Sequence, residues 1–353
     1  MSKKILLVLC ILAFVGYSFS DIRSMSLNDI FMANCVAVRM SENNIVMDFI
    51  SENTKESEDG IMSFEIVRAE GDSFSQCINK AREKTGEQIN LGHLRSIFLE
   101  ESFFNERQNY SDLLDMIKRE RFISNYVSFY ILSDPDDELT KHIKEKNPQI
   151  SAFVSNVVIK YPSSETLVMK YKDVAGESSE YCLPCIAVAD EIKLDGIYSL
   201  KNGRLVSKYT GIDEAMFKLL SKKVNQLYIS TDACAFLVNK HSVKLVREGE
   251  LKFAYELQLW CEMKELWGES VSVYDGDEED MEQKIEKELS GYMKRFISEM
   301  QKDNVDAAGI CDFLKKHYYK DYLVLNASHT DLFKDCEVGA RIKVHIIKNE
   351  LNK

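Results

Sequence analysis

The chain of 353 residues has a formal net charge of −12, with 45% hydrophobic and 29% charged residues. This is the composition of an ordinary globular protein that can bury substantial cores, and its length predicts two domains. The acidic balance argues against binding to nucleic acid or to anionic lipid surfaces.

The N-terminus has the three parts of a secretory signal. A basic start precedes the apolar run Ile5–Val15, and Ser18 and Ser20 offer small residues to a signal peptidase. We therefore expect export, with cleavage between Ser20 and Asp21. The alternative is an uncleaved anchor, although the apolar stretch is shorter than the roughly 20 residues that a helix needs to span a bilayer. No later segment is apolar enough to be a second membrane span.

The first half of the exported chain mixes strand and helix patterns. Gly71-Asp72-Ser73 precedes apolar residues at helical spacing, and Gly86 ends that helix. Strands are predicted at 30–40, 44–50, 62–68, 96–99 and 126–132. Further helices are predicted around 113–117, after Asp134-Pro135-Asp136, and over 150–170.

In the second half the strongest local signal is Asn202-Gly203, the dipeptide of a two-residue β-hairpin, between strands within 193–209. Apolar residues alternate from Leu251 to Met263, which predicts a long strand with one buried face. An acidic run, 275–282, precedes a helix with an apolar stripe from Met281 to Met300. Other elements are predicted as a helix at 213–225, strands within 227–247, a helix at 307–318 and a final strand through 342–346.

These elements predict an α+β fold with mixed, largely antiparallel sheets flanked by helices. Between residues 173 and 184 the pattern lapses into Gly, Ser and charged residues, which is where we expect the domain boundary. The expected division is a signal segment at 1–20, an N-terminal domain at 21–175, a linker at 176–188 and a C-terminal domain at 189–353. The two sequence domains can resolve into three structural ones.

The sharpest motif for chemistry is Cys182-Leu183-Pro184-Cys185, within a chain of nine cysteines. Two thiols at this spacing can form a redox-active or structural disulfide, or hold half of a metal site. A redox motif should open a helix, whereas Ile186-Ala187-Val188 looks extended. A structural disulfide between Cys182 and Cys185, free thiols and catalytic redox chemistry all remain open.

No other pattern supports a catalytic, cofactor or metal site. The six histidines are dispersed, and His93 has no companion at a metal-ligand spacing. The acidic run at 275–280 does not match a calcium-binding EF-hand loop, and it suits a solvated linker before a helix. We therefore predict a protein without a catalytic site, cofactor or bound metal.

The order of segments resembles the C subunit of bacterial spore germinant receptors, the Ger(x)C family, along nearly all of the exported chain. Ala69-Glu70-Gly71 before a helix is similar to the family's "AEG", and His93-Leu94-Arg95 before an apolar strand to its "HLK". Other similar segments are 113–119, the hairpin at 194–206, Val305-Asp306-Ala307-Ala308-Gly309 and 313–318.

The resemblance implies a non-enzymatic α+β subunit on the outer face of the spore inner membrane. Its implied partners are the membrane-embedded A and B subunits, which hold most of the nutrient binding. The family is usually lipidated on a cysteine, but Ser18 stands near the expected position of that cysteine and cannot carry the lipid. The competing hypotheses are an exported thiol-disulfide protein using Cys182 and Cys185, and a secreted solute-binding protein with an interdomain cleft.

Overall fold

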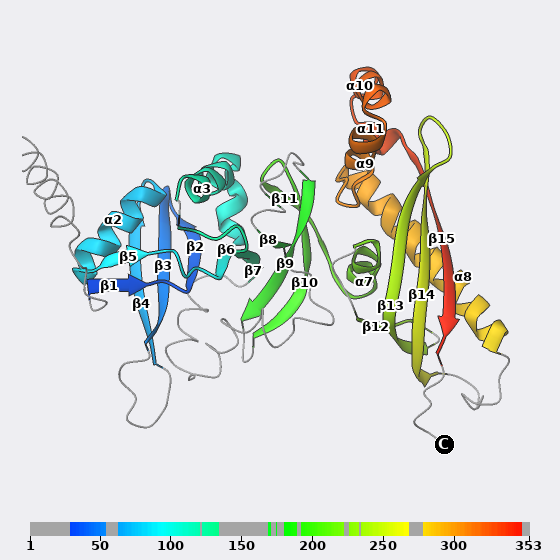
Figure 1. Cartoon of the computed structure of the whole chain (residues 1–353), viewed down its shortest axis with the longest axis horizontal. Helices are drawn as coiled ribbons and strands as arrows, with labels where there is room; N and C mark the ends of the chain where they lie inside the picture. The colour runs from blue at the N-terminus through cyan, green and yellow to red at the C-terminus, as the bar shows by residue number, and fades with distance from the viewer. Residues whose placement is uncertain are drawn as a thin grey trace, which may run out of the picture.

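The computed structural model describes residues 29–53, 63–120, 122–133, 169–170, 174, 180–188, 192–221, 226–232, 234–267 and 278–347. The expected signal segment, with Ser18, Ser20 and Asp21, lies outside these residues. So do the helix expected after Asp134, most of the helical pattern at 150–170 and part of the acidic run. The described elements follow one another along an elongated body, from the N-terminal strands at one end to the C-terminal sheet at the other (Figure 1).

A nine-stranded mixed sheet forms the first large part of the molecule. Its order is β11-β10-β9-β7-β6-β2-β3-β4, and β8 pairs with β7. The four central strands pair in parallel, and antiparallel strands flank them. The strands are β2 (Cys35–Ser41), β3 (Asn44–Asn53), β4 (Ser63–Gly71), β6 (Ser96–Glu100), β7 (Ser128–Leu132), β8 (Met169–Lys170), β9 (Glu180–Val188), β10 (Ile192–Lys201) and β11 (Arg204–Tyr209).

The centre of this sheet is buried on both faces and mostly apolar, as expected for parallel strands. Every residue of β6 and of β7 is buried. On β3 the buried carboxylate of Asp48 lies between two arginines: a guanidinium nitrogen of Arg39 is 3.0 Å from it, and one of Arg68 is 2.6 Å from it. Two guanidinium groups therefore compensate the one carboxylate in this part of the sheet.

The expected strand at 30–40 is divided in two. Residues Ile30–Met32 form β1, which pairs in parallel with β5 (Gln88–Asn90), and β2 then joins the large sheet. A tight turn connects β2 to β3, with Glu42 at a φ of 54°. The break arises because one extended segment supplies strands to two separate sheets, which local periodicity does not encode.

The helix predicted after Gly71 is confirmed as α2 (Phe74–Thr85). The Ser73 hydroxyl accepts a hydrogen bond from the backbone N–H of Gln76 at 3.3 Å, which caps the N-terminus. Gly86 ends the helix in the left-handed conformation, with a φ of 73°. A short 3-10 helix, η2 (Glu101–Asn105), and α3 (Arg107–Arg119) follow β6.

Strand β9 corrects the expected linker at 176–188. Residues 180–188 pair with β10 on one side and β7 on the other, so they lie inside the sheet. Residues 181–188 are buried, although Pro184 has no N–H to donate. The strand that pairs with β9 on one side, β7, ends 48 residues before β9 begins. The local sequence around Cys-Leu-Pro-Cys therefore could not indicate this pairing. Met169–Lys170 likewise forms β8 where a helix was expected.

The hairpin at Asn202-Gly203 is confirmed. Asn202 and Gly203 have φ values of 53° and 74°, the left-handed pair that a type I′ turn requires. They join β10 to β11, the edge of the nine-stranded sheet. Helix α7 (Gly211–Leu220) follows; it overlaps the helix expected at 213–225 but begins two residues earlier, and it leads toward the C-terminal sheet.

The C-terminal sheet has the order β12-β13-β14-β15. Its strands are β12 (Leu227–Ser230), β13 (Cys234–Arg247), β14 (Lys252–Leu266) and β15 (Glu337–Ile346). The alternation predicted for β14 is confirmed, because Phe253, Tyr255, Leu257, Leu259 and Cys261 are all buried.

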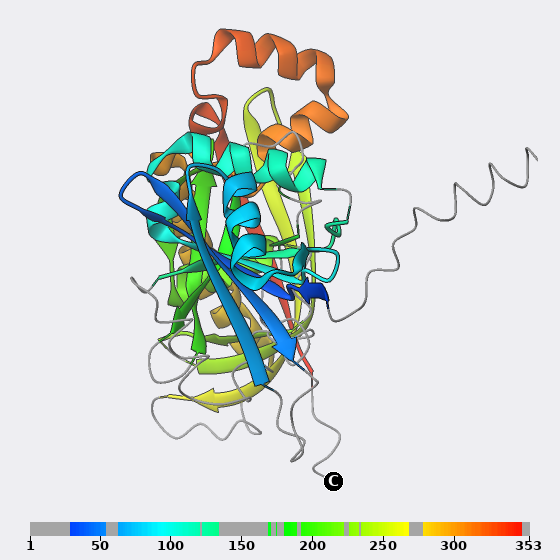
Figure 2. The same ribbon diagram turned by 90° about the vertical axis from the view of Figure 1, so that its left-hand side faces the viewer.

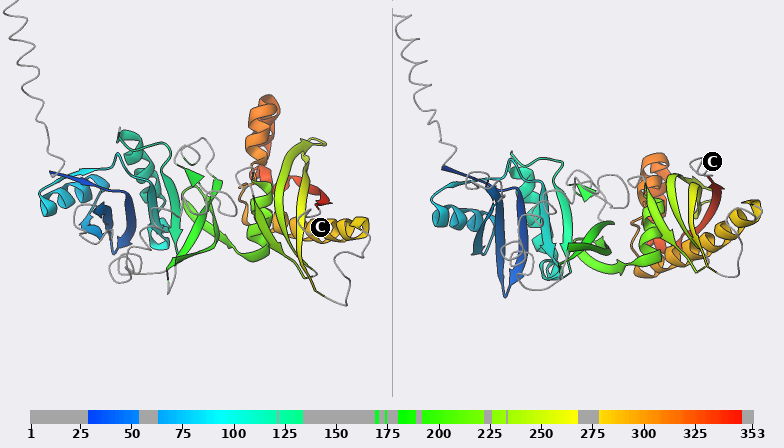
Figure 3. Two further views of the ribbon diagram at one scale, coloured as in Figure 1. Left: turned by 60° about the horizontal axis from the view of Figure 1, so that its bottom comes forward. Right: turned by 90° about the horizontal axis from the view of Figure 1, so that it is seen from below.

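Helix α8 (Glu278–Asp303) runs along one side of this sheet (Figure 3). Its predicted stripe is confirmed: Ile285, Leu289, Met293, Phe296 and Met300 are buried, and Met281 packs at the edge of the core. The helix predicted at 307–318 begins later, as α9 (Ile310–His317), and two further helices follow it, α10 (Tyr319–Ser328) and α11 (Leu332–Asp335).

Candidate functional site

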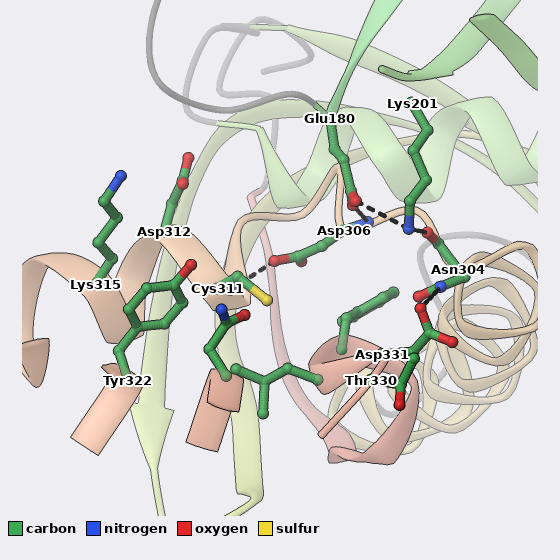
Figure 4. Close-up of a pocket in the computed structure, with 13 residues that line it drawn as sticks. Glu180, Lys201, Asn304, Asp306, Cys311, Asp312, Lys315, Tyr322, Thr330 and Asp331 are labelled. Atoms are coloured by element: carbon green, nitrogen blue, oxygen red, sulfur yellow. Dashed lines mark hydrogen bonds and ion pairs between the residues drawn. The ribbon is translucent and has the colours of Figure 1, made fainter. Parts of the chain in front are cut away.

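A polar pocket of about 240 Å³ lies where the segment that connects helices α8 to α11 meets the ends of β9 and β10 in the nine-stranded sheet. Figure 4 shows its residues, which come from segments more than a hundred positions apart. One wall holds Glu180, the first residue of β9, and Lys201, the last of β10. The other wall comes from the turn after α8 and from α9, α10 and α11, and it includes Asn304, Asp306, Cys311 and Asp331.

Asp306 organises the turn between α8 and α9. Its carboxylate accepts hydrogen bonds from the backbone N–H groups of Gly309 at 3.0 Å, Ile310 at 2.8 Å and Cys311 at 2.5 Å. The first turn of a helix leaves such N–H groups without partners inside the helix. Gly309, at a φ of 83°, brings the chain round into α9 in a conformation that suits glycine. The Asp306 side chain therefore fixes where α9 begins.

The same turn is bound to the nine-stranded sheet through Glu180. The backbone N–H of Asp306 donates a hydrogen bond to Oε2 of Glu180, and Nζ of Lys201 lies 3.0 Å from Oε1 of that carboxylate. Lys201 also donates to the backbone oxygen of Asn304. Glu180 and Lys201 are paired neighbours on β9 and β10. Two adjacent strands thus hold the turn with one carboxylate and one ammonium group.

The C-terminal sheet holds the turn from its other side. The hydroxyl of Tyr255, on β14, donates to the backbone oxygen of Ala308 at 3.0 Å. Nearby, the hydroxyl of Ser207 on β11 donates to a carboxylate oxygen of Asp303, the last residue of α8, at 2.5 Å. Residues 303–309 are therefore a joint with hydrogen bonds to both large sheets. We call this segment, with Glu180 and Lys201, the junction.

Burial sets the electrostatics of the junction. It raises the pKa of Asp306 from 3.8 to about 7, and the nearby Glu180 carboxylate acts in the same direction. The backbone N–H groups of Ile310 and Cys311 oppose this, because they favour the charged carboxylate. Burial and the Asp306 carboxylate also raise the pKa of the Cys311 thiol. At neutral pH Cys311 is therefore a protonated thiol, and Asp306 holds a proton more readily than a carboxyl in water does.

Cys182 and Cys185 lie on β9 and are both buried free thiols in the structure. Three steps along an extended strand separate their Cα atoms by about 10 Å, beyond the roughly 7 Å that a disulfide can bridge. Burial raises the pKa of Cys185 to about 12 and also raises that of Cys182. A disulfide between them would need a bend in β9, and neither thiol is activated as a nucleophile.

The other candidate groups stand apart from the junction. His93 is exposed in the turn before β6. Among the residues that the structure describes, no group of three or more His, Cys, Asp or Glu side chains could hold a metal ion. Over the same residues, no helix is long and apolar enough to cross a membrane.

Sequence reasoning missed Glu180 and Lys201, because no local pattern links them to a turn more than a hundred residues away. Asp306 appeared only within a family-like segment, with no role assigned. The signal that could have identified its role is the sequence Asp306-Ala307-Ala308-Gly309-Ile310, in which an acidic residue and a glycine precede an apolar helix. The expected helix start at 307 is three residues early because Asp306 caps α9 across the turn.

Comparison with known proteins assigns the chain to a family. Residues 23–187 match the family model described as "Spore germination protein N-terminal domain", and residues 195–350 match "Spore germination B3/ GerAC like, C-terminal". No curated protein matches the chain. A solved structure titled "Crystal Structure of the GerBC protein" is similar in fold, with a TM-score of 0.56 and 14% identity over 89% of this chain and 97% of that one. The chain therefore belongs to the GerAC family of spore germination proteins, the C subunits of germinant receptors.

Proposed function

We propose that this chain is a non-enzymatic, extracytoplasmic subunit of a nutrient germinant receptor, which assembles with the membrane-embedded A and B subunits. The observation that carries the proposal is the match of two domain models for spore germination proteins along nearly the whole chain. The junction is consistent with such a role, because its charged groups bind one another and the backbone. They join two parts of a scaffold.

A thiol-disulfide enzyme is the less favoured function. An enzyme of that kind needs an accessible thiol with a lowered pKa, usually at the start of a helix. Cys182 and Cys185 lie in a sheet strand, are buried, and have raised pKa values. Replacement of both by serine should abolish function if the thiols are catalytic and leave it largely intact in a receptor subunit.

A solute-binding protein is also less favoured. Pockets for small ligands usually enclose about 300–1,000 Å³ and are largely apolar. The pocket at the junction is smaller, at about 240 Å³, and Glu180, Lys201 and Asp306 already bind partners within the protein. We place nutrient recognition mainly in the A and B subunits.

The proposed location is the outer face of the spore inner membrane. Export follows from the basic and apolar N-terminal segment, and we propose cleavage between Ser20 and Asp21. Ser18 provides no thiol for acylation, so contacts with the partner subunits or an uncleaved apolar segment would keep the chain at the membrane. Mass spectrometry of the mature N-terminus distinguishes these two arrangements.

Deletion of the gene tests the function. Spores that lack it should form normally but lose the germination response to at least one nutrient, and a plasmid copy should restore that response. A copy with serine at positions 182 and 185 should restore it as well. A normal response to every nutrient, in a strain without a second member of the family, would contradict the proposal.

A further inference from the structure

Helix α10 exposes apolar side chains at one extremity of the molecule. It stands beyond the C-terminal sheet in both side views (Figures 1 and 2). Tyr319 is 56% exposed, Leu323 50% and Val324 67%, while Leu325 points inward and is buried. Tyr319 and Leu323 are four residues apart, so they lie on the same side of the helix, with Val324 beside them. A helix that faces only water would carry polar residues on that side.

Basic side chains border this apolar face. Lys320 is exposed and precedes Val324 by one helical turn. Lys316 is also exposed, in the last turn of α9, three residues before α10 begins. Asp321, the one acidic residue in the sequence of α10, has its carboxylate 2.5 Å from Arg247 on β13. The Arg247 guanidinium also lies 4.8 Å from the ring of Tyr318. The acidic group of α10 is therefore neutralised by β13, and the helix is held in place by the same arginine.

We propose that this face, Lys316, Tyr319, Lys320, Leu323 and Val324, docks onto the headgroup region of an anionic phospholipid bilayer. Tyrosine and lysine suit that region, because each has an apolar body and a polar end. The net charge of −12 opposes general attraction to an anionic surface. This local cationic face therefore dictates the orientation in which the protein meets the membrane.

The inference deepens the proposed location at a membrane, but it does not depend on the A and B subunits. The test uses the full chain with vesicles of phosphatidylcholine alone or mixed with phosphatidylglycerol, and no partner protein. Residues 1–20 can hold the chain on either vesicle, so the readout must be local. Hydrogen–deuterium exchange of the backbone amides of residues 316–328 provides it.

Exchange across α10 should slow at least tenfold on vesicles with phosphatidylglycerol and remain unchanged on phosphatidylcholine. The variant Lys316→Glu/Lys320→Glu should abolish the slowing, since each lysine adds about fivefold to affinity for an anionic surface. The variant Leu323→Asp/Val324→Asp should also abolish it, because it places two negative charges where apolar side chains would enter the headgroup region. Val206→Asp, at an apolar position 40% exposed on β11, is the matched control and should behave as wild type. Unchanged exchange in α8 shows that each variant is folded.

Two results would overturn the inference. One is equal exchange of α10 on both kinds of vesicle. The other is slowing only in membranes that contain the A and B subunits, which would make the face a protein-binding surface. Neither result would affect the test of the proposed function, which measures nutrient response in spores.

Discussion

Replacement of Asp306 by asparagine should remove a pH dependence of folding that the junction creates. Burial raises the pKa of this carboxyl from 3.8 to about 7 in the folded protein. The folded state therefore binds a proton more tightly than the unfolded chain does. The stability from this group is fully present below pH 4 and is lost as the pH rises through 7.

The size of the effect follows from the shift. Three pKa units correspond to about 4 kcal/mol over the full range, of which roughly 2.5 kcal/mol falls between pH 5 and pH 8. The introduced amide is uncharged at every pH. Its single oxygen cannot accept all three hydrogen bonds that the two oxygens of Asp306 accept from the backbone N–H groups of Gly309, Ile310 and Cys311. The Asp306→Asn variant should therefore lose about 1 kcal/mol at low pH, where the wild-type carboxyl is also neutral, and gain on wild type as the pH rises.

Urea unfolding followed by tryptophan fluorescence measures this difference. The two tryptophans of the chain, Trp260 and Trp267, lie within and just after β14, so they report on the C-terminal sheet. The wild-type free energy of unfolding should fall relative to the Asp306→Asn variant from pH 5 to pH 8. A constant difference would refute the reasoning, because it would mean that the helix N–H groups outweigh burial and keep the folded pKa near its ordinary value.

Three further substitutions have expected outcomes. Asp48→Ala should lower the free energy of unfolding by about 3–5 kcal/mol in urea titrations, because it leaves two arginine side chains without their buried partner; an effect below about 1 kcal/mol would contradict this. Phe296→Ala should cost about 3–5 kcal/mol by the same measurement, since its ring is fully buried and packs edge-on against Tyr209, with 5.0 Å between the ring centres; Leu323→Ala, at an exposed site, is its control. Cys182→Ser/Cys185→Ser should lower stability by about 1–3 kcal/mol per buried hydroxyl while spores retain nutrient germination; loss of germination with normal protein levels would instead favour thiol chemistry.

Elements with strong local signals could be predicted from the sequence. Ser73 and Gly86 bracket α2 because their side-chain and backbone preferences act within one helical turn. Asn202-Gly203 specifies its hairpin by the same kind of local preference. The alternation along β14 and the stripe along α8 were also visible, because each reflects burial of one face of a regular element.

The rest depends on contacts between distant segments. Glu180 begins β9, whose partner β7 ends almost fifty residues earlier. Without that pairing, residues 176–188 have the local pattern of a linker. Helix α10 has apolar residues on two sides, Leu325 inward and Val324 outward, which blurs the helical period that prediction needs. The bond from Asp306 to Glu180 spans 126 positions, and only the folded arrangement brings these two residues together.

Purification of the chain from spore membranes tests directly whether it assembles with the A and B subunits. A tagged copy that restores nutrient germination in the deletion strain is extracted in mild detergent, and its companions are identified by mass spectrometry. If the proposed assembly is right, the A and B subunits of one germinant receptor co-purify with it in comparable amounts. Recovery of the functional tagged chain without either membrane subunit would contradict it.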